Sequence, residues 1–138
     1  VPNGMLSVTE KRARDYVSES PNSRRLLPIG FDHPTVVSAI YNVASNMDIE
    51  PSEVWTVGSS GTLTRGLQLA WPRASFHCVC VGHSGNYGKA KIYKSKYAFN
   101  KPTKILPPFP SAPTYDAKAW EFMLDHASPG ALFWNVGA

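Results

Sequence analysis

The chain has 138 residues, of which 43% are hydrophobic and 17% are charged, with 12 prolines and a formal net charge of +4. This length suits one domain, and the apolar content excludes an intrinsically disordered or collagen-like chain. No apolar run approaches the roughly 20 residues needed to cross a bilayer, so no membrane span is predicted. We therefore expect a single domain over residues 1–138.

The charged and sulfur-containing residues exclude several classes of partner. A lysine run between Lys89 and Lys104 is interleaved with aromatic residues, as in some nucleic-acid-binding surfaces. A solvated edge strand protected by lysines explains that run more simply, so nucleic acid is not the expected partner. Cys78 and Cys80 have no histidine at metal-ligand spacing, so no metal site is expected. They indicate buried free thiols in a cytoplasmic protein.

Helices and strands are expected to alternate through the first half of the chain. A helix over residues 7–20 would be capped by Ser7, with Glu10 at the spacing of a capping box. A second helix over residues 34–46 begins with Pro34, which is favourable in a first helical turn. The other expected elements are the end of a strand at 1–4, strands at 25–30, 53–57 and 76–81, and a helix at 62–70.

The second half begins with a glycine-containing loop at 82–88 and a strand at 90–97. A proline-rich extended arm at 100–113 precedes a helix at 115–126 and a strand at 131–136. Short apolar strands that alternate with helices predict an α/β fold with three layers, in which helices cover both faces of a mostly parallel sheet. Such sheets bind ligands at the carboxyl ends of their strands.

The segment most typical of a binding site is GSSGT at residues 58–62, between an expected strand and an expected helix. Its glycines allow a tight turn, and the amides of Ser60, Gly61 and Thr62 would point outward where a helix begins. The helix dipole and free N–H groups favour a phosphate there, and Arg65 would add positive charge. The spacing is neither a P-loop nor a dinucleotide fingerprint. The alternative is a plain helix start with Thr62 as the N-cap.

This loop resembles the phosphate-binding loop of fold-type II pyridoxal-phosphate enzymes, roughly G-x-G-G-T on a strand-to-helix turn. Residues 115–120, YDAKAW, and 132–137, LFWNVG, resemble the Y-x-G-K-A helix and L-F-x-H-T-G-G strand of the D-cysteine desulfhydrase and aminocyclopropane-carboxylate deaminase branch. The resemblance implies pyridoxal phosphate as cofactor and an origin among amino-acid lyases or deaminases. The cofactor-binding residues that it implies are Gly58, Ser59, Ser60, Gly61, Thr62 and Asn135.

The chain departs from that family at positions that matter for catalysis. It matches the C-terminal half of a full enzyme, and none of its lysines matches the Schiff-base lysine, which the family carries in a more N-terminal segment. Val136 aligns with the threonine that faces the pyridine nitrogen, and Asn135 stands where histidine would. The catalytic residues are therefore unidentified. We expect an incomplete enzyme, completed by a missing N-terminal segment or by a homodimer partner.

A weaker resemblance leads to a different ligand at the same loop. Glu53 followed by VWT and GSSGT resembles the strand and T-x-G-G-T loop of type I phosphoribosyltransferases, which would hold a ribose phosphate. Here the strand has one acid instead of two, and the loop is about one residue longer. Both resemblances imply a small phosphorylated ligand. A non-catalytic binding module is the further alternative.

Five more residues are candidates for a pocket beside the loop. Asp32 and His33 follow an expected strand end, where Asp32 would orient the histidine or act as a base, although capping of the next helix is favoured. His83 and Ser84 follow another strand end, in the glycine-containing loop. Tyr87 would stack on a cofactor ring, and a surface tyrosine is the simpler interpretation.

Overall fold

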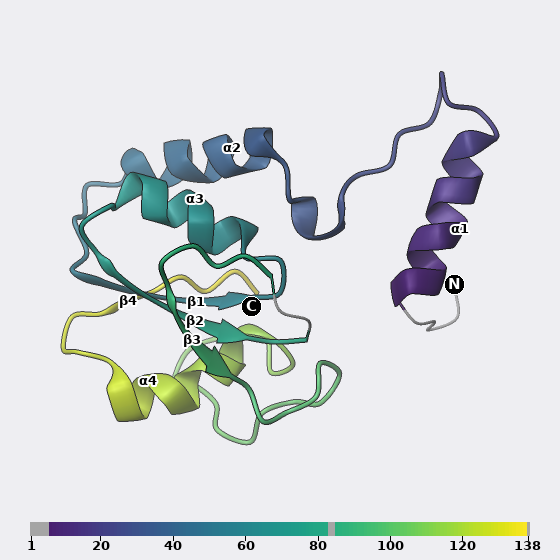
Figure 1. The fold of residues 1–138 in the computed structure, drawn as a ribbon. Coiled ribbons are helices and arrows are strands. Elements are labelled where there is room, and N and C mark those ends of the chain that lie inside the picture. The colour runs from purple at the N-terminus through teal and green to yellow at the C-terminus, as the bar shows by residue number, and fades with distance from the viewer. Residues whose placement is uncertain (1–5, 83–84, 138) are drawn as a thin grey trace.

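The computed structural model describes residues 6–82 and 85–137, and a four-stranded parallel sheet forms its centre (Figure 1). The strand order is β3-β2-β1-β4, and all three neighbouring pairs are parallel. The long central pair aligns Val54 with Phe76 and Gly58 with Cys80. The strands are β1 (Glu53–Gly58), β2 (Ser75–Cys80), β3 (Lys91–Lys94) and β4 (Leu132–Phe133).

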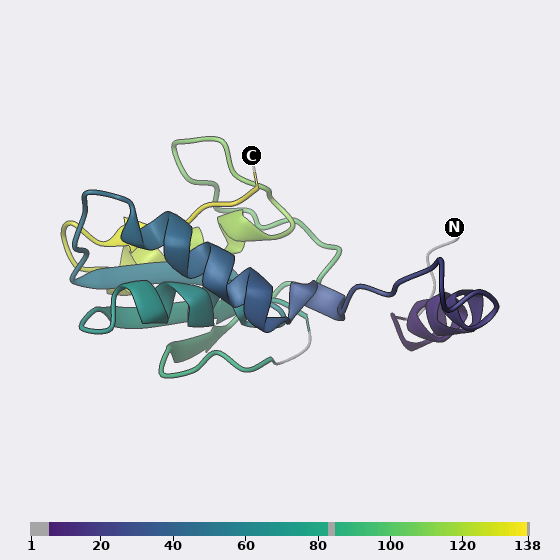
Figure 2. The ribbon, with the colours of Figure 1, turned by 90° about the horizontal axis from the view of Figure 1, so that it is seen from above.

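Helices cover both faces of this sheet. Figure 1 shows α2 (Pro34–Ser45) and α3 (Thr62–Ala70) on one side, with α4 (Trp120–His126) on the other. The short 3-10 helix η2 (Asp116–Ala119) leads directly into α4. Seen from above, α2 and α3 lie in front of the sheet (Figure 2). The predicted α/β fold is confirmed, because parallel strands need long crossover connections and these connections place helices on the two faces.

Strand β1 lies between two hydrophobic clusters, and all six of its residues are buried. Val54 packs with Leu67, Trp71 and Phe76 beneath α2 and α3. Trp55 faces the opposite side, in a cluster with valines of β1 and β2 and with residues of η2 and α4. Alternate residues of a strand point to opposite faces, so one apolar segment supplies both clusters.

Two predicted strands differ from the structure. Residues 24–28 form no regular structure, and the chain turns through the 3-10 helix η1 (Ile29–Phe31) instead of pairing as a strand. Leu27 is 66% exposed there, because no neighbouring strand lies beside this segment to receive its hydrogen bonds. The last strand contains only two residues, although the Trp134 amide adds one bond to the Trp55 carbonyl.

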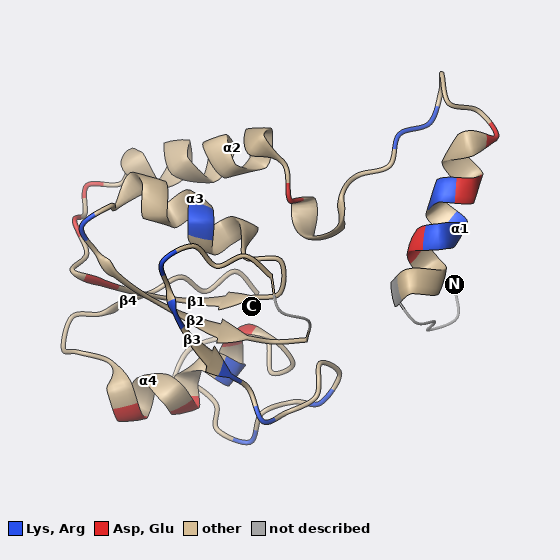
Figure 3. Ribbon diagram, in the orientation of Figure 1, with Lys and Arg blue, Asp and Glu red and all other residues tan. Residues whose placement is uncertain are grey.

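The remaining predicted elements have the expected type, with changes at their ends. The helix expected at 115–126 starts as the 3-10 turn η2, and Ser7 lies inside a helix instead of capping it. The strand expected at 90–97 is shortened to β3, at the edge of the sheet. The lysines expected on an edge strand are present there as Lys91 and Lys94 (Figure 3). The strand end expected at 1–4 lies outside the described residues.

Helix α1 (Leu6–Ser18) stands apart from the rest of the molecule, at the end of an extended connection (Figures 1 and 2). Ion pairs one turn apart, including Lys11 with Asp15 at 2.9 Å, support it locally. Within residues 6–82 and 85–137 we find no helix of the length and apolarity that crossing a bilayer requires.

Candidate ligand site at the carboxyl edge of the sheet

The GSSGT loop lies at the carboxyl end of β1, as predicted. Gly58 is the last residue of β1, and α3 begins at Thr62. The residue before the helix is Gly61, with φ of 84° in the left-handed region, and no side chain caps the helix. A Cβ atom on Gly61 would lie 2.0 Å from the Asn86 carbonyl oxygen, so only glycine fits here. Thr62 is the first helical residue, and the alternative in which it acts as the N-cap is wrong.

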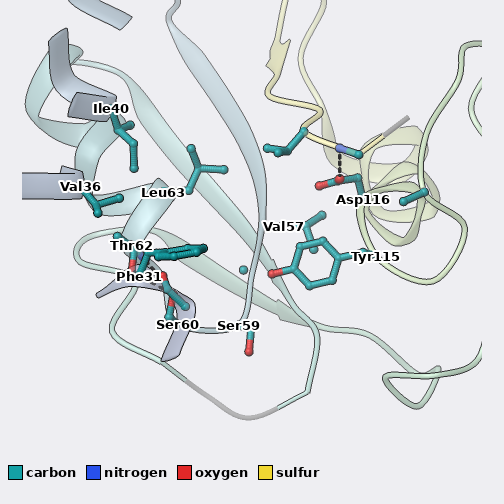
Figure 4. Close-up of a pocket in the computed structure, with 16 residues that line it drawn as sticks. Phe31, Val36, Ile40, Val57, Ser59, Ser60, Thr62, Leu63, Tyr115 and Asp116 are labelled. Atoms are coloured by element: carbon teal, nitrogen blue, oxygen red, sulfur yellow. Dashed lines mark hydrogen bonds between the residues drawn. The ribbon is translucent and has the colours of Figure 1, made fainter. Parts of the chain in front are cut away.

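A cavity of about 460 Å³ opens beside this loop (Figure 4). Phe31, Ser60 and Thr62 lie on one side of it, and Tyr115 and Asp116 lie on the other. Most of the remaining lining is apolar and comes from α2, β1 and the C-terminal tail, including Val36, Ile40, Val57 and Val136. Its size and mixed lining are typical of small-molecule sites.

Asp116 lines the cavity and has one carboxylate oxygen without a hydrogen-bond partner among the described residues. The residue is 2% exposed, and its Oδ2 atom accepts a 2.7 Å hydrogen bond from the Gly137 amide. Its Oδ1 atom is buried and has no hydrogen-bond partner among the described residues. Burial raises the pKa of Asp116, and the amides of Gly137 and Val136 offset only part of that rise. An unpaired acceptor of this kind is costly to bury.

Tyr115 forms the wall next to Asp116. Its hydroxyl group points across the cavity toward the side where Ser59 lies (Figure 4). Burial, followed by the charge of the adjacent Asp116, raises the pKa of Tyr115 to about 12, so its hydroxyl is protonated at neutral pH. The sequence alone did not single out these two residues as part of the site. The available signal was their place in the YDAKAW segment that carries the resemblance.

The hydroxyl groups of the GSSGT loop already have a partner. Ser60 Oγ and Thr62 Oγ1 lie 3.2 Å and 3.1 Å from the carbonyl oxygen of Gly30, to which both donate. Arg65 forms an ion pair with Asp32 and also donates to the carbonyl oxygen of Asn86. The hydroxyl donors predicted for a phosphate therefore line the cavity and Arg65 does not, and the chain itself engages all of these groups.

Asn135 and His33 do not line the cavity. Asn135 Nδ2 donates to the Pro110 carbonyl and its Oδ1 accepts from Ser111 Oγ, both at 2.8 Å, so this side chain holds the proline-rich arm. His33 is the N-cap of α2, because its Nδ1 atom accepts a hydrogen bond from the Thr35 amide. The prediction that Asp32 caps this helix is therefore wrong. His83 and Ser84 lie outside the described residues.

Tyr87 supports the loop from below, so both sequence-based interpretations of it are wrong. The residue is buried, and its hydroxyl donates to the carbonyls of Ser59 at 3.0 Å and Gly58 at 3.3 Å. The same oxygen lies 3.1 Å from Cys80 Sγ. Cys78 and Cys80 are both buried thiols that form no disulfide, as predicted. Tyr87 therefore holds two carbonyls of the loop and does not line the cavity.

None of the described residues that line the cavity is a lysine. The buried lysine of the YDAKAW segment, Lys118, is fully enclosed and donates to the carbonyls of Ala98 at 2.9 Å and Phe99 at 3.2 Å. Burial lowers the pKa of Lys118. In the part of the chain that the structure describes, no group of three or more His, Cys, Asp or Glu side chains is placed to hold a metal ion.

The fold and the cavity together define an α/β protein with a cavity at the carboxyl ends of the strands of a parallel sheet. Comparisons with family models, with curated proteins and with solved structures find no match to the chain.

Proposed function

We propose that this chain is a phosphate- and cofactor-binding α/β domain related to pyridoxal-phosphate-dependent amino-acid lyases or deaminases. One observation carries the proposal: the GSSGT loop and Asp116, whose Oδ1 atom is buried without a hydrogen-bond partner among the described residues, line one cavity from opposite sides. A ligand with an anionic group at one end and a hydrogen-bond donor at the other would match both. The buried thiols support a reducing, cytoplasmic location.

Pyridoxal phosphate fits the binding half of this site. The start of α3 would receive the phosphate, the apolar walls and Tyr115 would flank the ring, and Asp116 would accept a hydrogen bond from the far side. When bound, the cofactor supplies an electron sink for amino-acid chemistry. The covalent half does not fit, because no described residue that lines the cavity is a lysine. We therefore propose binding, and we derive no catalytic step.

The phosphoribosyltransferase-like alternative receives less support. It needs an acidic residue near the loop, at the end of the preceding strand, to hold ribose hydroxyls. Glu53 instead starts β1, at the opposite edge of the sheet. Its Oε1 atom accepts from Trp55 Nε1 at 2.6 Å and from the Ser128 amide at 3.1 Å. The Glu53 carboxylate is therefore engaged far from the cavity.

Calorimetric titration of the chain with pyridoxal phosphate and with pyridoxal tests the proposal. We expect pyridoxal phosphate to bind, and pyridoxal, which lacks the phosphate, to bind at least tenfold more weakly. Thr62→Val removes one hydroxyl donor at the helix start, and we expect it to weaken the phosphate-dependent binding about tenfold. Equal affinity for the two compounds would contradict a phosphate site.

A matched control separates a local effect from a general one. Ser38→Ala also removes one hydroxyl, from an exposed position on α2 that does not line the cavity, and should leave both affinities unchanged. Phosphoribosyl pyrophosphate with magnesium provides a third titration. If that compound stabilises the protein against heat and pyridoxal phosphate does not, the alternative function is the correct one.

A further inference from the structure

The segment before α2 contacts the same groups that would hold a phosphate. We call residues 28–32 the Gly30 turn. Its Gly30 carbonyl accepts hydrogen bonds from Ser60 Oγ and Thr62 Oγ1, which also lie 2.9 Å from each other. A carbonyl oxygen carries partial negative charge, as a phosphate oxygen does to a greater degree. The turn therefore places an acceptor of the chain itself at the start of α3.

The Gly30 turn also forms an ion pair with a positively charged residue of α3. Asp32 pairs with Arg65, a residue of the first turns of α3 whose side chain is 21% exposed. A carboxylate and a phosphate compete for the same guanidinium donors. Both the hydroxyl donors and the positive charge expected at a phosphate site are thus engaged by two neighbouring parts of one short segment.

The backbone of this turn is held in an unfavourable conformation. Gly30 and Phe31 both have positive φ, of 66° and 51°, and a bulky residue such as Phe31 rarely adopts the left-handed region. Phe31 lines the cavity, but 57% of its surface remains exposed. Strain at a weakly buried position persists only where contacts hold it. Backbone hydrogen bonds from the Phe31 amide to Pro28 and from the His33 amide to Phe31 hold it locally, and the contacts to the GSSGT loop and to Arg65 tie it to α3.

The neighbouring elements would allow the turn to move. Residues 24–28 before it have no regular structure, and α2 after it is fixed by its own N-cap, His33. Movement of the turn would therefore leave the sheet and the helices unchanged. In the closed arrangement seen here, the turn covers one side of the cavity (Figure 4).

We propose that the Gly30 turn is an autoinhibitory element, which competes with the anionic group of the ligand for Ser60, Thr62 and Arg65. This inference rests on the proposed function, since it requires an anionic ligand at the GSSGT loop. Binding replaces the Gly30 carbonyl and the Asp32 carboxylate with the anion, and the turn moves away from the start of α3. The affinity of the intact chain is then lower than that of a chain whose turn is already open.

Two variants open the turn by independent means. Asp32→Asn removes the charge that holds Arg65. Gly30→Ala places a Cβ atom 2.5 Å from both Cβ and Oγ of Ser60, which the closed turn cannot accommodate. The control is Glu50→Gln, which removes the same charge from another exposed ion pair, with Arg73, outside the cavity. The probes are inorganic phosphate and pyridoxal phosphate, titrated at constant ionic strength.

We expect Asp32→Asn and Gly30→Ala to bind both probes about three- to fivefold more tightly than the parent chain, with no change for Glu50→Gln. Adding Arg65→Gln to Asp32→Asn should remove the gain, because the freed guanidinium causes it. If the parent chain binds and Asp32→Asn binds equally or more weakly, the turn does not compete and the inference is wrong, while the proposed function stands. An equal gain in Glu50→Gln would also overturn it. If neither the parent chain nor any variant binds either probe, the proposed function itself fails.

Discussion

Buried polar groups are satisfied differently at the two ends of the strands. We call the end where the strands begin the amino edge, and the end where they finish the carboxyl edge. At the amino edge, the Glu53 carboxylate receives hydrogen bonds from Trp55 and Ser128. At the carboxyl edge, the more deeply buried Asp116 has one oxygen paired with Gly137 and the other without a hydrogen-bond partner among the described residues. The pKa shifts follow this difference. Burial alone would raise the pKa of Glu53, but the hydrogen bonds outweigh it and the pKa is lowered, whereas the pKa of Asp116 is raised.

Aromatic packing strengthens the contrast. Trp55 stacks on His77 at 4.5 Å between ring centroids and on Tyr93 at 5.0 Å. His77 Nδ1 lies 3.0 Å from the Tyr93 hydroxyl, so the polar atoms of these rings also have partners. The carboxyl edge has a cavity instead of a stack of rings. The amino edge therefore stabilises the fold, and the carboxyl edge leaves a buried carboxylate oxygen of Asp116 unpaired at some cost in stability.

The largest expected effect comes from breaking the amino edge. Trp55→Ala removes a fully buried side chain that joins both stacking partners to Glu53, and we expect a loss of about 4 kcal/mol in the free energy of unfolding. Urea denaturation followed by circular dichroism measures it. Leu124→Ala, on the exposed side of α4, is the control and should change the free energy by less than about 0.5 kcal/mol. A similar loss in both variants would mean that the amino edge is not the stabilising one.

A smaller effect is expected when Glu53 loses only its charge. Glu53→Gln keeps an oxygen for Trp55 and Ser128 but weakens both bonds, so we expect a loss of about 1.5 kcal/mol at pH 7. The folded-state pKa is lowered, so this stabilisation is present above the unfolded-state value of about 4.3 and disappears as pH falls through the folded-state pKa. The difference between the variant and the parent chain should therefore vanish in acid. A difference that is independent of pH contradicts the assigned role of the charge.

The smallest expected effect has the opposite sign. Asp116→Asn can still accept from the Gly137 amide but removes a poorly compensated buried charge, so we expect a gain of about 1 kcal/mol at pH 7. The folded-state pKa is raised, so the penalty is absent below the unfolded-state value of about 3.9 and grows as pH rises through the folded-state pKa. Thermal unfolding between pH 4 and 7 measures this gain. A lower free energy of unfolding for Asp116→Asn at pH 7 would contradict an uncompensated charge on Asp116. The same variant should also bind pyridoxal phosphate more weakly.

Local sequence pattern was sufficient for most of the regular structure. The apolar run EVWTV and the Gly-Ser loop after it placed β1, the GSSGT turn and the start of α3 close to their observed positions. The proline before TVVSAI likewise marked the start of α2. These features depend on hydrophobic spacing and backbone conformation within a few residues, which the sequence displays directly. The strand predicted at LLPIG had a similar pattern but lacks a neighbouring strand, and no local signal shows that absence.

The sequence by itself determined the α/β class and the position of the GSSGT loop at a strand end. Only the tertiary structure decided which groups meet that loop. Asp116 is 54 residues or more from the loop in the chain, and the Gly30 carbonyl precedes it by 28 residues or more, yet both lie at the same cavity. Their roles depend on desolvation and on hydrogen bonds across layers. Those forces act through space, so they exist only once the sheet has brought distant segments to one edge.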